Sequence, residues 1–229
     1  MVSVIKLELY KILRGRIPFY ILAFYCFLVF IHMQDKTWIT FLNGTFFMYT
    51  SIIGLMGFGI LSSWTFGREY QDQTFKDMLA LPIKRTSIIC AKFLALELSY
   101  IVITAVAILV TFLLGFCFHM TGFNLTITAE MVRLLVVSTM FNVGLSFLYP
   151  FISSITRGIL APISISFVAL IIAVMFGSQP IGRFVPWSVP GIYLVNPQLI
   201  NKLSTLSISV VVLLGVYGTI IWWNFIDQK

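Results

Sequence analysis

Six apolar runs, each about as long as a membrane-spanning helix, constrain this sequence more than any other feature. They cover residues 17–33, 44–66, 93–117, 131–152, 159–177 and 206–226. About 20 apolar residues in a helix cross the roughly 30 Å hydrocarbon core of a bilayer. The runs are continuously apolar, whereas a membrane β-barrel would show alternating polarity. Because lipid offers the backbone no hydrogen-bond partners, the runs are predicted to be helices. The predicted fold is an all-α polytopic membrane protein, with one domain covering 1–229.

Composition excludes a water-soluble protein. Hydrophobic residues make up 59% of the 229 positions and charged residues only 10%, whereas soluble domains carry roughly 25% charged residues. Three cysteines without CxxC spacing and two well-separated histidines predict neither a disulfide framework nor a metal site.

The placement of lysine and arginine predicts the orientation of the spans. If the N-terminus is cytoplasmic, eleven of the fifteen basic residues lie on the cytoplasmic side, as the positive-inside rule requires. They are Lys6, Lys11, Arg14, Arg16, Arg68, Lys76, Lys84, Arg85, Lys92, Arg157 and Lys229, against Lys36, Arg133, Arg183 and Lys202 outside. Both termini are therefore expected in the cytoplasm. The net charge of +7 fits contact with anionic lipid headgroups, and no nucleic-acid partner is expected.

Charge is concentrated in one cytoplasmic stretch, "FGREYQDQTFKDMLALPIKR", residues 66–85. The spacing of its apolar residues predicts an amphipathic helix from Arg68 to Leu81 that Pro82 ends. Glu69 is expected on the exposed polar face near the start of this helix. Two interpretations follow from the residues: a solvated surface helix, or a docking helix for a soluble cytoplasmic partner.

A longer stretch, "FGREYQDQTFKDMLALPIKRTSIICAKF", resembles the cytoplasmic segment that joins the second and third spans of ABC-2 type transporter permeases. The matching residues are Glu69, Thr74, Leu79, Leu81, Pro82, Arg85 and Lys92. Gln73 departs from the family pattern, because many members have glycine there. Within the family, the short length resembles the small permeases of bacitracin-resistance and lantibiotic-immunity systems.

The resemblance implies that residues 67–85 couple the chain to a separate ATPase subunit. The implied contact residues are Arg68, Glu69, Asp72, Gln73, Thr74, Phe75, Lys76, Leu79, Pro82 and Arg85. The sequence contains no GxxxxGK[ST] motif, so no catalytic residue or cofactor is expected in it. The partner would bind ATP and Mg. Charge reversal at Glu69 is expected to uncouple transport without unfolding the protein, since an exposed carboxylate near a helix start contributes only about 0.3–1 kcal/mol.

The start of the chain, "KLELYKILRGR", resembles the interfacial helix that opens these permeases. A helix over 1–16 is predicted to lie on the inner leaflet with one apolar stripe in lipid. The stripe comprises Val2, Ile5, Leu9, Ile12 and Leu13.

Residues 178–204 contain four prolines among many apolar residues. One interpretation is a loop on the outer headgroup layer, anchored by Trp187 and Tyr193. The family resemblance implies instead short re-entrant helices that close the outer mouth, with Pro186, Trp187, Pro190 and Tyr193 as their candidate residues. Such backbone is tolerated at membrane depth where protein buries it.

Glu97 is the clearest charged residue inside a predicted span. It is either a polar group on the transport path or a carboxylate near the cytoplasmic interface that pairs with Lys92 or Arg157.

Together these features predict the permease subunit of an ATP-driven exporter in the cell membrane of a bacterium. The aromatic content of 16% suits an amphipathic substrate such as a peptide antibiotic, exported or extracted from the membrane. Two permease copies, or one copy and a related permease, are expected with two ATPase subunits. The alternatives are a partner-free secondary transporter or channel, for which only Glu97 is a candidate ligand, and an intramembrane enzyme. The sequence leaves the substrate, and the choice between homodimer and heterodimer, open.

Overall fold

The structure, a computed structural model, describes residues 2–79 and 82–225, with the side chains of Lys76 and Leu79 outside the description. The described chain is helical, apart from one isolated bridge between Thr37 and Thr121. Its elements are α1 Val2–Arg14, α2 Ile17–Ile31, η1 His32–Gln34, α3 Trp38–Met48, η2 Tyr49–Gly57, α4 Phe58–Gln71, α5 Phe75–Leu79, α6 Arg85–Cys117, α7 Leu125–Ser146, α8 Leu148–Thr156, α9 Leu160–Gly177, η3 Pro180–Phe184, α10 Val189–Val195, η4 Pro197–Leu199 and α11 Lys202–Phe225.

Six helical segments of the described chain are long and apolar enough to cross a membrane. They are Ile17–Gln34, Trp38–Gln71, Arg85–Cys117, Leu125–Thr156, Leu160–Gly177 and Lys202–Phe225. Each predicted apolar run lies inside one of these segments, except that the fifth run starts one residue before Leu160 and that position 226 of the last run lies outside the described residues. The all-α fold with six candidate spans is confirmed. Several segments extend well beyond the apolar runs because their polar ends remain helical.

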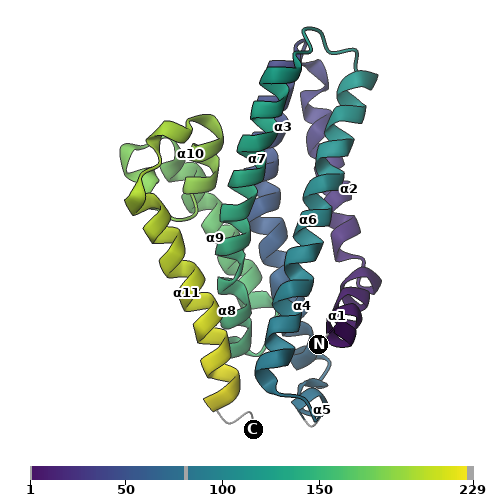
Figure 1. Ribbon diagram of the computed structural model, residues 1–229, viewed down its shortest axis with the longest axis vertical. Helices are drawn as coiled ribbons and strands as arrows, with labels where there is room; N and C mark the ends of the chain where they lie inside the picture. The colour runs from purple at the N-terminus through teal and green to yellow at the C-terminus, as the bar shows by residue number, and fades with distance from the viewer. Residues whose placement is uncertain (1, 80–81, 226–229) are drawn as a thin grey trace.

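The helices stand side by side in an elongated bundle (Figure 1). α1, α5 and the last turns of α11 gather at one end, here called the α5 end. α1 packs along α6, while α11 and α4 both pack against α8. The described chain therefore begins and finishes at the same end, as an even number of spans requires.

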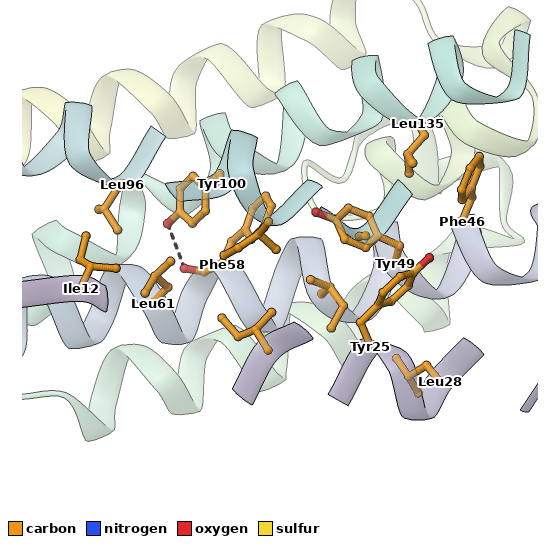
Figure 2. Packing of buried hydrophobic residues seen from close by; sticks show 14 of the residues in the cluster. Ile12, Tyr25, Leu28, Phe46, Tyr49, Phe58, Leu61, Leu96, Tyr100 and Leu135 are labelled. Carbon is orange, nitrogen blue, oxygen red and sulfur yellow. Dashed lines mark hydrogen bonds between the residues drawn. The ribbon is translucent and has the colours of Figure 1, made fainter. Parts of the chain in front are cut away.

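Aromatic and aliphatic side chains fill the centre of the bundle, and tyrosine hydroxyls lie among them (Figure 2). Phe58 stacks on Tyr100 with ring centroids 4.1 Å apart, and the Tyr100 hydroxyl donates to the Phe58 carbonyl oxygen at 3.1 Å. The Tyr49 hydroxyl lies 2.8 Å from Thr104 Oγ1. Each of these hydroxyls has a partner inside the bundle, because hydrocarbon would offer none.

The second span contains a nine-residue π-helix, η2. The Asn142 side chain of α7 donates to a backbone oxygen of this element, the Thr50 carbonyl oxygen, at 2.9 Å. A Cβ at Gly54 would overlap the Asn142 amide, so the glycine allows α7 to approach η2 this closely.

The predicted placement of the α1 apolar stripe in lipid is wrong for Ile12, which faces protein. The Ile12 side chain is 1% exposed and lies near Leu61 and Leu96 (Figure 2). Leu13, by contrast, is exposed, and its placement in lipid stays a prediction. The inward face of α1 also contains Glu8, which is buried and has charged partners on other helices.

Residues 178–204 form three short helical elements, η3, α10 and η4, which lead into α11. α10 packs against α7, and the Ser138 hydroxyl of α7 donates to the Pro190 carbonyl oxygen at 3.0 Å. Tyr193 meets Phe141 edge-on at 5.4 Å, while Trp187 is half-buried. The segment is therefore packed on the bundle rather than laid out as an extended loop.

Candidate functional site

The charged stretch is two helices joined by a tight turn, so the predicted single helix from Arg68 to Leu81 is wrong. α4 ends at Gln71 and α5 begins at Phe75. Gln73 is left-handed with φ +58°; its N–H donates to the Tyr70 carbonyl at 3.4 Å, and the Thr74 N–H to the Glu69 carbonyl at 3.0 Å. This pair of bonds is the Schellman pattern that closes helices. Many members of the family that the sequence resembles have glycine at this position. A glycine there fits this turn, because glycine adopts positive φ without strain.

We expect Gln73→Gly to stabilise the protein by about 0.5–1 kcal/mol. Glycine relieves the strain of the left-handed backbone at this position, but it also loses more conformational entropy on folding than glutamine does, which cancels part of the gain. Thermal unfolding in detergent would measure the change. Gln71→Gly is the matched control, since Gln71 is exposed but helical, and glycine there should cost about 1 kcal/mol. Equal effects of the two substitutions would contradict the turn assignment.

A buried lysine, Lys92 of α6, is the centre of the site. Its side chain is fully buried, with 0% exposure. Its Nζ donates to Glu69 Oε1 of α4 at 2.8 Å, to Glu8 Oε2 of α1 at 3.0 Å and to the Thr65 carbonyl oxygen at 3.1 Å. The three protons of the ammonium group are all used, so Lys92 joins three helices through charged hydrogen bonds.

Lys11 completes the cluster from the surface of α1. Its Nζ lies 2.8 Å from Glu8 Oε1 and 3.1 Å from Glu69 Oε1. Two carboxylates thus face two ammonium groups. Burial of Glu8 would raise the pKa of its carboxyl, but the positive charges of Lys92 and Lys11 outweigh burial and hold that pKa below its ordinary value. We call Glu8, Lys11, Glu69 and Lys92 the ion cluster.

Glu69 therefore does not lie on an exposed helix face as predicted. It is 6% exposed and is in the last turns of α4. The expectation that its charge reversal leaves the fold intact relied on exposure, and that premise is wrong. Glu8 was not predicted as a site residue. A carboxylate placed between Ile5 and Ile12 in an apolar stripe was the signal that could have revealed it.

The apolar side of α5 rests on aromatic rings. Phe75 stacks on Tyr70 at 4.2 Å and meets Trp223 of α11 edge-on at 4.9 Å. The Trp223 indole N–H donates to Ser154 Oγ of α8 at 2.9 Å. Phe75, predicted as an ATPase contact, is 5% exposed, so it anchors α5 to the bundle instead of facing outward.

The side chains of Lys76 and Leu79 lie outside the described residues, and the other predicted contact residues divide between the bundle and the surface. Arg85 donates through Nη1 to the Trp223 carbonyl oxygen at 2.8 Å, so it ties the start of α6 to the end of α11. Asp72, Gln73, Thr74 and Pro82 are exposed. Arg68 is partly exposed and donates to Asp72 Oδ2 at 3.0 Å. We call the end of α4, the turn and the start of α5, residues 68–75, the α4–α5 corner. It presents a polar surface, and aromatic and ionic contacts beneath that surface hold it to the bundle.

Residues 4–173 match a family described as ABC-2 family transporter protein. The chain belongs to this family. It is a transporter permease, the membrane subunit without an ATPase domain, and membership implies an ATPase partner. The match covers the ion cluster and the α4–α5 corner, whereas α10 and α11 lie beyond it.

The permease is also similar to a characterised relative, the bacitracin transport permease protein BCRB of Bacillus licheniformis. The two are 22% identical over 179 residues, which cover 77% of this chain and 86% of the relative. No solved structure matches the chain.

Glu97 of the permease does not pair with Lys92. Its side chain is half-buried on α6, and within residues 2–79 and 82–225 it forms no ion pair. Lys92 has its three acceptors elsewhere. Glu97 is thus a carboxylate of the third span that the described part of the chain leaves without a cation.

Proposed function

We propose that this permease is the membrane subunit of an ATP-driven exporter for an amphipathic substrate, a peptide antibiotic of the bacitracin or lantibiotic kind. The relative BCRB carries bacitracin transport in its description. The aromatic content of 16% suits a substrate with a large apolar surface. A polar solute would need more charged groups within the spans, and Glu97 is the main candidate.

The α4–α5 corner is the observation that carries the proposal. It carries exposed polar residues at the α5 end, while Phe75 and Tyr70 fix it to the bundle. A segment that is exposed on one side and rigidly anchored on the other can transmit the movement of a docked ATPase. We place the α5 end in the cytoplasm, with both termini, on the basis of the lysine and arginine distribution.

The assembly would contain two permeases, either identical or related, and two ATPase subunits that bind ATP and Mg. On the outer side, α10 and its neighbours would be re-entrant and close the pathway. The burial of Pro190 against Ser138 supports this part of the proposal, since irregular backbone at membrane depth must be covered by protein. Pro186, Trp187 and Tyr193 would line this closure.

The test is a resistance assay. Cells that express the permease with its ATPase partner should tolerate more of at least one agent in a panel with bacitracin and a lantibiotic. A partner whose P-loop lysine is replaced is the control, and it should abolish the gain. No gain with any peptide would contradict the substrate class. Resistance that persists without ATP hydrolysis would favour the secondary-transporter alternative.

A further inference from the structure

A cleft opens beside the ion cluster at the α5 end. It has a volume of about 410 Å³ and lies between α1, the last turns of α4 and α5. Glu8, Lys11, Trp64, Glu69, Asp72 and Asp77 are among its lining residues. The cleft is formed by the two segments that the family resemblance singled out, the N-terminal helix and the coupling stretch.

One acceptor in this cleft has no donor. Glu69 Oε1 takes both lysines of the ion cluster, while Glu69 Oε2 is buried and forms no hydrogen bond with the described residues. A carboxylate oxygen can only accept, and a buried acceptor left unpaired is unfavourable. More than nine-tenths of the Glu69 residue is buried, but the residue lines the cleft, so a donor that reaches Oε2 from the cleft has to displace the atoms that cover this oxygen.

The charges around the cleft favour a cationic donor. Among the described side chains, the carboxylates are those of Glu8, Glu69, Asp72 and Asp77. The basic groups are those of Lys11, Arg68 and Lys92, so acid is in excess. Arg68 is already held by Asp72 and lies over the Trp64 ring at 5.0 Å. Asp77 is exposed and forms no ion pair within the described part of the chain.

We propose that the cleft receives an arginine side chain of the ATPase partner, which donates to Glu69 Oε2 and to the Asp77 carboxylate. A guanidinium group can reach two acceptors at once, unlike an ammonium group of the same charge. This inference rests on the proposed function and extends it, because α1 becomes part of the docking surface and the ion cluster orients the acceptor. Lys92 and Lys11 are then positioning residues for that contact.

The test compares Glu69→Gln with Glu8→Gln in the purified permease. Each substitution removes one negative charge from the same cluster, so both should lower the melting temperature by similar amounts. Both Glu8 oxygens are taken by lysines, whereas the Glu69 amide would turn a donor toward the incoming guanidinium. We expect Glu69→Gln to raise the Kd for the purified ATPase about tenfold or more, and Glu8→Gln to raise it less than about threefold.

A third variant, Asp77→Asn, keeps the experiment decisive if Glu69→Gln does not fold. Asp77 lies outside the ion cluster, so its melting temperature should not change, while the Kd should rise and its dependence on salt should decrease. Unchanged binding in Glu69→Gln and Asp77→Asn, or an equal loss in Glu8→Gln, would overturn the arginine contact while leaving the proposed function intact. Failure of the unmodified permease to bind the ATPase would overturn both.

Discussion

Lys92→Ala is expected to destabilise the permease by about 3–5 kcal/mol, because it leaves Glu8 and Glu69 buried with too few partners. Lys92 is 0% exposed and its Nζ contacts both carboxylates within 3.0 Å. The loss is large because a buried charge without its counter-ion retains its full desolvation cost. Equilibrium unfolding in detergent, followed by helical circular dichroism, would measure it.

Lys84→Ala is the matched control, since Lys84 lies at the start of the same helix and is exposed. It should change stability by less than about 0.5 kcal/mol. Adding Glu8→Gln and Glu69→Gln to Lys92→Ala should restore part of the loss, because the unpaired charges are then gone. If the unfolding free energies of Lys92→Ala and Lys84→Ala differ by less than about 1 kcal/mol, the ion cluster does not stabilise the fold.

The same cluster revises what charge reversal at Glu69 would do. Glu69→Lys places a third ammonium group beside Lys92 and Lys11, with only Glu8 to balance them. The variant should lower both the yield of folded protein and the coupling to the ATPase, so it cannot tell a folding defect from a coupling defect. The comparison of Glu69→Gln with Glu8→Gln does distinguish these two defects.

Span positions were predictable because apolar length alone decides whether a helix crosses a bilayer. The ion cluster was not, since Lys92 and Glu8 are 84 residues apart in the chain and no local pattern joins them. The break at Gln73 was hidden for a different reason. Positive φ is common for glycine, and a glutamine carries no sequence signal of it.

The error at α1 has a general cause. An amphipathic pattern shows that one face of a helix is apolar, but lipid and protein interior are both apolar surroundings. The sequence pattern at Ile12 fits contact with lipid and contact with protein equally well. Only Glu8 favours protein, because a carboxylate in the apolar face needs a charged partner that lipid cannot supply. The outward side of α1 keeps apolar residues such as Leu13 and Tyr10 exposed, which leaves contact with a membrane surface available to it.

Trp223→Ala is the second substitution with a large expected effect. The Trp223 ring is fully buried and meets Phe75 of α5 and Phe66 of α4. Truncation of a buried tryptophan costs about 3–5 kcal/mol in soluble proteins. We expect about 3 kcal/mol here, because lipid reduces the apolar transfer part of that cost and leaves mainly the lost packing. Thermal unfolding in detergent would measure it.

The position of Trp223 makes its effect reach beyond stability. Its ring contacts Phe75 edge-on, its indole N–H donates to Ser154 of α8, and its carbonyl oxygen accepts from Arg85 of α6. Removing the ring should loosen α5 from α11, so a cysteine introduced at Asp77 should react faster with a soluble thiol reagent in Trp223→Ala than in the parent. Trp223→Phe keeps a six-membered ring and loses the pyrrole part of the indole with its bond to Ser154, so a smaller loss than in Trp223→Ala is expected.

Tyr217→Ala provides the control on the same helix, because Tyr217 is 59% exposed and should respond by less than about 1 kcal/mol. If Tyr217→Ala matches Trp223→Ala in melting temperature and labelling rate, the effect on α5 does not depend on the contact between Trp223 and Phe75. If Trp223→Ala unfolds more easily but leaves labelling near α5 unchanged, the tryptophan stabilises α11 against α8 alone. In that case the corner would depend on Tyr70 and the ion cluster for its support, and α11 would not be mechanically joined to it.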